Sequence, residues 1–372
     1  MKPANILFGA KGSGREDRAA RMVQELTFNA VVESRFKDAS YYYWLLASET
    51  LRVAAKKDNL QKVMATYTDQ LHKADLYYAY AHVEDFFLPY TPLRPEVLFQ
   101  CARFLINGLG GREAPHGISR AKILYTLAKQ AKTCGAFKLA RYAYDKLLRM
   151  KLPDAWRDEV DVDALTIGAA PLRDKSDLLP VCYRCGASNA LLNPANSHSQ
   201  GTSVHRDVCT SCGHPFVRSF LNFEVLPLIE FVPEASISDE EALDLIKEFP
   251  EDKNSGEGKE ADHMYVDDED EDRFTRAIND TLQAQAGADE YKPVTVDAET
   301  LRSLYRAEVF CCAPRQQGLR ATYYKSAIPD VHMALSQPCN RFFHEDDFEY
   351  AVLKEGKCPY SRAKEVGDFG TV

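Results

Sequence analysis

Two CxxC pairs are the feature that most constrains how this chain folds. Cys182 and Cys185 form the first pair, Cys209 and Cys212 form the second, and 23 residues separate the two pairs. A CxxC turn brings two thiolates close enough to share one ion, and two such turns complete the tetrahedron that zinc prefers. Four protein ligands leave no open position for water or substrate. The spacing therefore predicts a structural zinc site.

Charge is distributed unevenly along the 372 residues. Residues 1–180 carry 27 Lys and Arg against 21 Asp and Glu, whereas residues 181–372 carry 19 against 34. An acidic second half argues against nucleic acid as a partner, because phosphate binding needs clustered positive charge. No run approaches the roughly 18 apolar residues of a transmembrane segment, and a signal-peptide core is lacking. We therefore expect a soluble intracellular protein whose ten cysteines stay reduced, which favours metal ligation over disulfides.

The first half of the chain has the apolar periodicity of helices. Between residues 25 and 165, apolar side chains recur three and four positions apart, and stretches rich in Gly and Pro interrupt them. Residues 124–153 look like one tetratricopeptide unit, in which two helices form a hairpin. Several hairpins in series predict a tetratricopeptide-like α-solenoid over residues 25–165, after a flexible N-terminus at residues 1–24.

Basic side chains concentrate in the last of these helices, between Arg112 and Lys151. The simpler interpretation is the solvated face of a helical hairpin. The alternative is a docking patch for an acidic protein or for anionic lipid.

Three segments follow the solenoid. Residues 178–249 are predicted to form a zinc ribbon and a short helix whose N-cap is Ser238. Residues 250–272 are predicted to form an acidic linker, because their composition buries too little apolar surface to fold. Residues 273–366 are expected to form a small RING-like or zinc-finger-like module that is degenerate. The predicted fold class is thus mainly α: a tetratricopeptide-like α-solenoid, then a zinc ribbon, then a small RING-like or zinc-finger-like module.

A second group of metal-binding side chains lies in the last segment. Cys339, His344 and Cys358 are candidate ligands, but Ser336 and Ser361 stand where a second cysteine would complete each pair. Serine hydroxyls are poor zinc ligands at neutral pH, since the metal prefers thiolate or imidazole. We therefore expect one zinc ion per chain, at the first site, and the sequence leaves open whether these three residues bind a second.

No motif predicts catalysis. The sequence has no HExxH and no nucleophile motif, and its glycine-rich stretch Gly9–Gly14 lacks the spacing of a phosphate loop. We expect a protein that is not an enzyme. One alternative is a RING-like ubiquitin ligase built on the last module, which needs two cross-braced zinc ions. Another is a nucleic-acid-binding zinc ribbon, against which the acidic second half argues.

Long and distinctive strings give the chain a family resemblance. The segment Asn29–Arg52, the strings CYRC and CTSCGHPFVRSF, and the closing FFHEDDFEYAVL and CPY resemble the intraflagellar transport protein 122 family, in the same order. The resemblance implies a solenoid and zinc-binding modules that act as a scaffold in intraflagellar transport complex A. It implies retrograde transport, ciliary import of membrane proteins, and a location in the cilium or flagellum, basal body and cytoplasm. The implied partners are the other complex A subunits, with membrane cargo adaptors or anionic lipid as further contacts.

Two departures from the family stand out. Its members begin with tandem WD40 β-propellers, which this chain lacks, so we expect a C-terminal piece, a truncated chain or a short gene product. The family's closing motif resembles CxxC…FFHxxDFE…CPxC, and serine replaces one cysteine of each pair here. The metal-binding role therefore carries over to Cys182, Cys185, Cys209 and Cys212, while it stays open at the second group.

Overall fold

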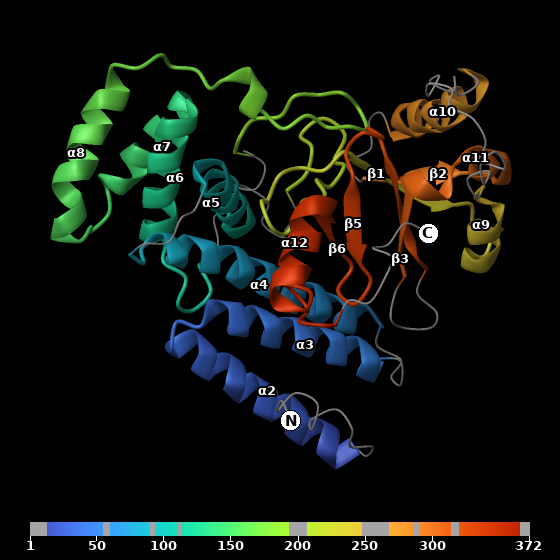
Figure 1. Cartoon of the computed structure of the whole chain (residues 1–372), viewed down its shortest axis with the longest axis horizontal. Helices are drawn as coiled ribbons and strands as arrows, with labels where there is room; N and C mark the ends of the chain where they lie inside the picture. Colours follow the sequence, from blue (N-terminus) through green and yellow to red (C-terminus); the bar gives the residue numbers. More distant parts are fainter. Residues whose placement is uncertain are drawn as a thin grey trace, which may run out of the picture.

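The computed structural model describes residues 13–54, 60–89, 94–110, 113–192, 207–247, 268–285, 291–313 and 320–364. Helices make up the first half of the chain, and a β-sheet with flanking helices lies toward its C-terminus (Figure 1). None of the helices in these ranges is long and apolar enough to cross a membrane. The architecture is mainly helical, as the sequence predicts.

The solenoid consists of consecutive helices that pack side by side. Each helix contacts the next one in the chain, and α4 also contacts α6. This pairing of sequence neighbours is the arrangement expected of tetratricopeptide-like hairpins. The helices are α2 (Ser13–Val32), α3 (Phe36–Ala54), α4 (Leu60–Phe86), α5 (Pro95–Leu109), α6 (Arg120–Cys134), α7 (Phe137–Leu147) and α8 (Asp154–Gly168).

The hairpin of α6 and α7 shows why the chain folds locally in this way. Ser119 caps the start of α6, because its hydroxyl accepts a hydrogen bond from the backbone N–H of Lys122 at 3.3 Å. Gly135 ends the helix with a left-handed φ of 86°, which glycine adopts without strain. A Cβ atom at Gly135 would lie 2.6 Å from Cε of Lys175, a flexible side chain that can move aside, so the positive φ is the main reason for glycine at this turn.

Helix α4 has two buried faces. Toward α3, the ring of Tyr77 stacks on that of Tyr43 with centroids 5.3 Å apart. On another face, the ring centroid of Tyr78 lies 6.3 Å from that of Phe223 and 5.0 Å from that of Tyr360. The solenoid therefore shares one continuous apolar core with the segments that follow it.

A four-stranded sheet of order β2-β1-β4-β3 forms the centre of the C-terminal half. β1 pairs in parallel with β2 and antiparallel with β4, and β4 pairs antiparallel with β3. A separate hairpin of β5 and β6 leads into helix α12, and Figure 1 shows both beside the solenoid. The strands are β1 (Leu228–Pro233), β2 (Val294–Val296), β3 (Val309–Cys312), β4 (Thr322–Ser326), β5 (Met333–Ser336) and β6 (Arg341–His344). The helices of this part are η1 (Ser176–Leu178), α9 (Asp239–Leu245), α10 (Asp268–Gln285), α11 (Ala298–Ser303), η3 (Arg306–Glu308) and α12 (Glu345–Glu355).

Two helices begin inside segments that the sequence predicts to be flexible. Helix α2 begins at Ser13, within the predicted flexible stretch 1–24, and α10 begins at Asp268, within the predicted linker 250–272. Residues 1–12 and 248–267 lie outside the described residues.

The end of the predicted ribbon segment belongs to the C-terminal core. Strand β1 hydrogen-bonds with β2 and β4, although the sequence places it with the ribbon at 178–249. Helix α9 lies in the same segment, and its Ala242 packs in one apolar cluster with Phe274 of α10 and Leu301 of α11. Because these pairings join residues far apart in the chain, local patterns did not reveal them.

Candidate metal centre

The four cysteines of the two CxxC pairs come together in the ribbon. Their Sγ atoms all lie within 4.8 Å of one another. The Sγ atoms of Cys182 and Cys212 are 3.6 Å apart, and those of Cys185 and Cys209 are 3.7 Å apart. A tetrahedral zinc ion with Zn–S bonds of about 2.3 Å places its sulfur atoms about 3.8 Å apart. The donor set and its spacing therefore fit a zinc ion with four thiolate ligands.

The backbone of both turns has the same hydrogen bonding. The N–H of Gly186 donates to the carbonyl oxygen of Cys182 at 2.8 Å, and the N–H of Gly213 donates to that of Cys209 at 2.9 Å. Both glycines have a φ of 71°, a conformation that other residues adopt only with strain. Each turn therefore folds its first cysteine back toward its second, which directs both thiols to one side.

Hydrogen bonds from outside the ligand set reach Cys209. The side-chain amide of Asn189 donates to its Sγ atom at 3.5 Å, and the N–H of Ser211 donates at 3.4 Å. The Oδ1 atom of Asn189 in turn accepts from the N–H of Thr210 at 2.8 Å, which fixes the orientation of the amide. Such donors stabilise negative charge on a metal-bound sulfur. Sequence reasoning missed Asn189, because an asparagine after a CxxC pair carries no recognisable signal.

The thiols are coupled to one another in the absence of metal ligation. The hydrogen bond between Cys182 and Cys212 lowers the pKa of the Cys212 thiol and raises the pKa of the Cys182 thiol. Zinc binds thiolates, so its binding by all four sulfurs would release the thiol protons, and metal affinity at this site depends on pH.

A buried polar group on the other side of the site faces the C-terminal sheet. His214 accepts a hydrogen bond at Nε2 from the N–H of Glu230 at 3.1 Å, and burial lowers the pKa of its imidazole to about 4. The imidazole is therefore neutral, and its Nε2 atom is hydrogen-bonded to β1 rather than directed at the metal site. The guanidinium of Arg184, in the first CxxC turn, lies 5.2 Å from the ring centroid of Tyr291. A zinc ion held by four thiolates would carry net negative charge, which a cation in the same turn would help to offset.

The second group of candidate ligands, Cys339, His344 and Cys358, is brought together only in part. The structure places Cys339 and Cys358 close together but holds His344 elsewhere: its Nε2 atom lies 3.3 Å from a carboxylate oxygen of Glu224, in the ribbon. Among the described residues, the four ribbon cysteines are the only group of three or more metal-binding side chains close enough to share an ion. The assignment of His344 as a ligand stays a prediction, and its contact with Glu224 depends on tertiary packing that local patterns do not encode.

Comparison with known proteins agrees with this architecture. A model of the IFT122 TPR domain matches residues 8–122, and a model of the IFT122 zinc ribbon domain matches residues 175–229. Proteins named intraflagellar transport protein 122 homolog from Danio rerio, Homo sapiens and Mus musculus are 39%, 36% and 36% identical over 361, 365 and 370 residues. The chain belongs to the intraflagellar transport protein 122 family. These alignments cover 94%, 94% and 96% of the chain, which spans 29%, 28% and 30% of the length of the three relatives.

The family's domains map onto the structure in a specific way. The zinc ribbon match at 175–229 contains all four cysteines of the site and ends just inside β1, which begins at Leu228. Strand β1 and helix α9 therefore lie almost entirely beyond the family's ribbon, in agreement with their packing in the C-terminal core. The TPR match ends at residue 122, inside α6, so most of α6 and the whole of α7 and α8 follow it.

Proposed function

We propose that this chain is a non-enzymatic scaffold within an intraflagellar transport protein, and that a zinc ion bound by Cys182, Cys185, Cys209 and Cys212 holds its modules in a fixed arrangement. The observation that carries this proposal is the position of the four thiols. They lie in a ribbon that contacts the solenoid on one side and the C-terminal sheet on the other. A structural zinc site stabilises such a small segment, which has little core of its own.

The contact with the solenoid is polar and buried. The side-chain amide of Asn107, on α5, donates to the carbonyl oxygen of Leu191 at 3.4 Å and to a carboxylate oxygen of Asp207 at 3.3 Å. Asp207 also forms an ion pair with the buried guanidinium of Arg218. Because buried ion pairs and amides tolerate little displacement, this network fixes how the ribbon sits on the solenoid.

The contact with the C-terminal module involves the ligand turns themselves. His214 follows the last ligand by two residues and binds the backbone of Glu230 in β1. The side-chain amide of Gln285, at the end of α10, donates to the carbonyl oxygen of Cys212 at 3.1 Å. Loss of the metal would therefore disturb the contacts of the ribbon with both neighbouring modules.

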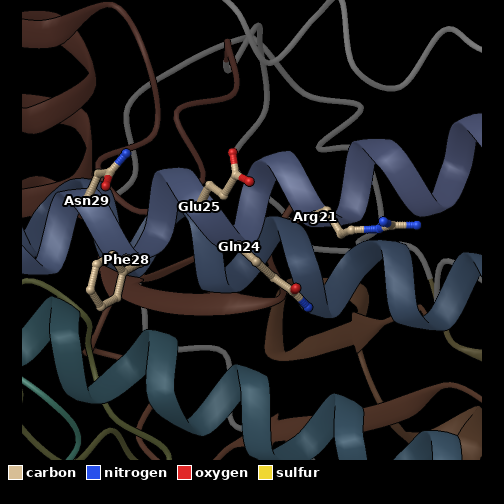
Figure 2. Close-up of a pocket in the computed structure, with 5 residues that line it drawn as sticks. All are labelled: Arg21, Gln24, Glu25, Phe28 and Asn29. Atoms are coloured by element: carbon tan, nitrogen blue, oxygen red, sulfur yellow. The ribbon is translucent and has the colours of Figure 1, made fainter.

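The surfaces of the solenoid suit protein contact. Figure 2 shows a hollow on the outer side of α2, lined by Arg21, Gln24, Glu25, Phe28 and Asn29 of that one helix. The Phe28 side chain is 61% exposed there. These five side chains include no Ser, Cys, Thr or His that could act as a nucleophile or paired base, so the hollow supports binding rather than chemistry.

Three basic side chains of α6 and α7 contact the neighbouring helix α8 and the residues just after it. Lys129 forms an ion pair of 2.8 Å with Glu159, and Lys132 forms one of 2.5 Å with Asp163, both on α8. Arg141 donates to three backbone carbonyl oxygens at the end of α8. These cations stabilise the packing of α8, which leaves less positive charge for anionic lipid. The proposed partners are therefore the other complex A subunits in the first place, with membrane cargo adaptors as a further contact.

The finer role follows from the family. We propose that the chain serves retrograde transport and ciliary import of membrane proteins, in the cilium or flagellum, the basal body and the cytoplasm. The family resemblance and the match to intraflagellar transport protein 122 homologs support this role.

Affinity purification from ciliated cells, followed by mass spectrometry, tests the scaffold role. We expect the native chain to recover complex A subunits and a Cys185→Ser/Cys212→Ser variant to lose them. Cys134→Ser is the matched control, because Cys134 is a half-buried cysteine of α6 outside the site. Recovery of no such subunit by the native chain would overturn the proposal. Autoubiquitination with purified conjugating enzymes would instead favour a RING-like ligase.

A further inference from the structure

Two serine-containing turns in the C-terminal module repeat the backbone of the zinc-ribbon turns. In the first, the N–H of Asn340 donates to the carbonyl oxygen of Ser336 at 2.8 Å. The N–H of Gly186 makes the equivalent bond to Cys182, also across four residues. Asn340 has a φ of 51°, close to the 71° of Gly186. Asparagine adopts the left-handed region more readily than most residues other than glycine, so the turn keeps a knuckle conformation.

The second turn, CPYSRA, matches its ribbon counterpart at two bonds. The N–H of Arg362 donates to the carbonyl oxygen of Cys358 at 2.9 Å, and the N–H of Cys358 donates to that of Ala363 at 2.8 Å. In the ribbon, the N–H of Cys209 likewise donates to the carbonyl oxygen five residues later, that of His214, at 2.8 Å. Arg362 has a φ of 56°, again left-handed. Both turns therefore have the backbone of a zinc knuckle.

The two turns face each other across a small buried cluster. The hydroxyl of Ser336 donates to Sγ of Cys358 at 3.4 Å and accepts from Sγ of Cys339 at 3.3 Å. The N–H of Ser361 donates to the same Cys358 sulfur at 3.4 Å. All four residues are buried. We call this set the serine–cysteine cluster: Ser336, Cys339, Cys358 and Ser361.

The donors of this cluster do not fit zinc. A zinc knuckle pair offers four thiolates or imidazoles, whereas two of the four side chains here are neutral hydroxyls. A hydroxyl is a poor ligand at neutral pH, and the third predicted ligand, His344, contacts Glu224 instead. The hydroxyl of Ser336 already serves as both donor and acceptor between the two thiols, so hydrogen bonds join the turns where a metal would otherwise do so.

Side chains from both turns meet one carboxylate of the solenoid. Arg341 directly follows the first turn, and its Nη2 atom donates to both carboxylate oxygens of Asp75 at 2.9 Å. Tyr360 lies within the second turn, and its hydroxyl donates to Asp75 at 2.6 Å. The guanidinium of Arg341 lies over the ring of Tyr360, 5.4 Å from its centroid, and over that of Phe220, at 4.9 Å. The positions of these two turns thus decide how the C-terminal module binds α4.

We propose that the serine–cysteine cluster is a metal-independent counterpart of a zinc knuckle pair, whose task is to hold Arg341 and Tyr360 on Asp75 and so to fix the C-terminal module to the solenoid. The chain then has two kinds of fastening between its modules. One is the ribbon, which depends on zinc, and the other is this cluster, which does not. The inference concerns metal content and packing and does not depend on the transport role.

Zinc counting on the purified 372-residue chain tests the metal-independent character. We expect one zinc per chain, with the same count in Cys339→Ser/Cys358→Ser and none in Cys182→Ser/Cys212→Ser. Two zinc ions in the native chain, falling to one in the Cys339→Ser/Cys358→Ser variant, would overturn the proposal. Because those two variants remove thiols and could unfold the chain, a gain of metal is the sharper measurement.

A Ser336→Cys/Ser361→Cys variant supplies that gain. It completes both pairs on backbone turns that already have the knuckle conformation, so we expect two zinc ions per chain. A matched control, Ser48→Cys/Ser303→Cys, adds two cysteines in α3 and α11, outside the ribbon site and the serine–cysteine cluster, and should still bind one ion. A count of one in the Ser336→Cys/Ser361→Cys variant would show that the turns are not knuckles.

Hydrogen exchange under chelation tests the fastening. We expect a zinc chelator to raise exchange in the ribbon turns at 182–186 and 209–213 several-fold, while residues 358–363 and the part of α4 around Asp75 stay protected. In an Asp75→Asn variant, exchange at 358–363 should rise without any change in zinc content. Equal loss of protection at both places on chelation, or unchanged exchange in Asp75→Asn, would contradict the proposal.

Discussion

Arg341 of β6 and Asp75 of α4 form a buried ion pair with two hydrogen bonds of 2.9 Å, although they lie 266 positions apart in the sequence. Their side chains are only 14% and 17% exposed. Burial removes both charges from water, so each depends on the other for compensation. Removing one partner therefore leaves a charge that the surrounding apolar rings cannot solvate.

The first prediction follows from this ion pair. Asp75→Ala should lower the free energy of unfolding by about 3–5 kcal/mol, because it leaves the guanidinium of Arg341 buried and unpaired. Urea denaturation followed by circular dichroism measures this change. The control is Asp154→Ala, whose side chain is 93% exposed in its ion pair with Arg157 and should cost at most about 1 kcal/mol. Similar effects of the two substitutions would show that the buried pair contributes little.

Local patterns were enough to predict the solenoid and the four-cysteine site. Helical periodicity and the spacing of CxxC pairs depend on residues a few positions apart, and the structure has both features as expected. The position of His344 is different, because its contact with Glu224 joins β6 to the ribbon across more than a hundred residues. The pairing of β1 with β2 likewise joins Phe231 to Val294, which no local pattern encodes.

The second prediction concerns pH. His82 is buried, with its ring centroid 5.6 Å from that of Tyr78 and 5.8 Å from that of Phe223. Burial, with a smaller effect from Lys37, lowers the pKa of its imidazole to about 4, against about 6.5 in an unfolded chain. Between these values the unfolded chain binds a proton that the folded chain does not, so stability falls as the pH drops.

From pH 7 to pH 5, this histidine should therefore cost about 2 kcal/mol of stability. His82→Phe keeps an aromatic ring in the same position and removes the titration, so its free energy of unfolding should fall by about 2 kcal/mol less over that interval. Urea denaturation of both proteins at the two pH values gives the difference directly. Parallel pH profiles for the native chain and the variant would show that His82 is not the titrating group.

The third prediction concerns metal removal. Structural zinc contributes on the order of 10 kcal/mol to the folding of small metal-binding segments, so chelation should unfold the ribbon while the packed helices α3 to α7 remain. Limited proteolysis should then cleave within residues 182–226, and helical circular dichroism should change little. Cys312→Ser, a substitution outside the site, should leave both the zinc content and the cleavage pattern unchanged. Loss of most of the helical signal on chelation would show instead that the solenoid itself depends on the metal.

The last prediction uses two glycines of the solenoid that differ in backbone conformation and in the space around them. Gly135 has a φ of 86°, and a Cβ atom there would lie 2.6 Å from Lys175, whereas nothing lies within 4 Å of a Cβ atom at Gly168. Gly135→Ala should therefore destabilise the chain by about 1–2 kcal/mol, through left-handed strain at the end of α6. Gly168→Ala, at the end of α8, should be neutral or stabilising by up to about 1 kcal/mol, since alanine restricts the unfolded chain more than glycine does. In thermal and urea denaturation, the free energies of unfolding of the two variants should thus change in opposite directions or differ by at least about 1 kcal/mol. Equal changes would mean that the turn between α6 and α7 relaxes at no cost in free energy.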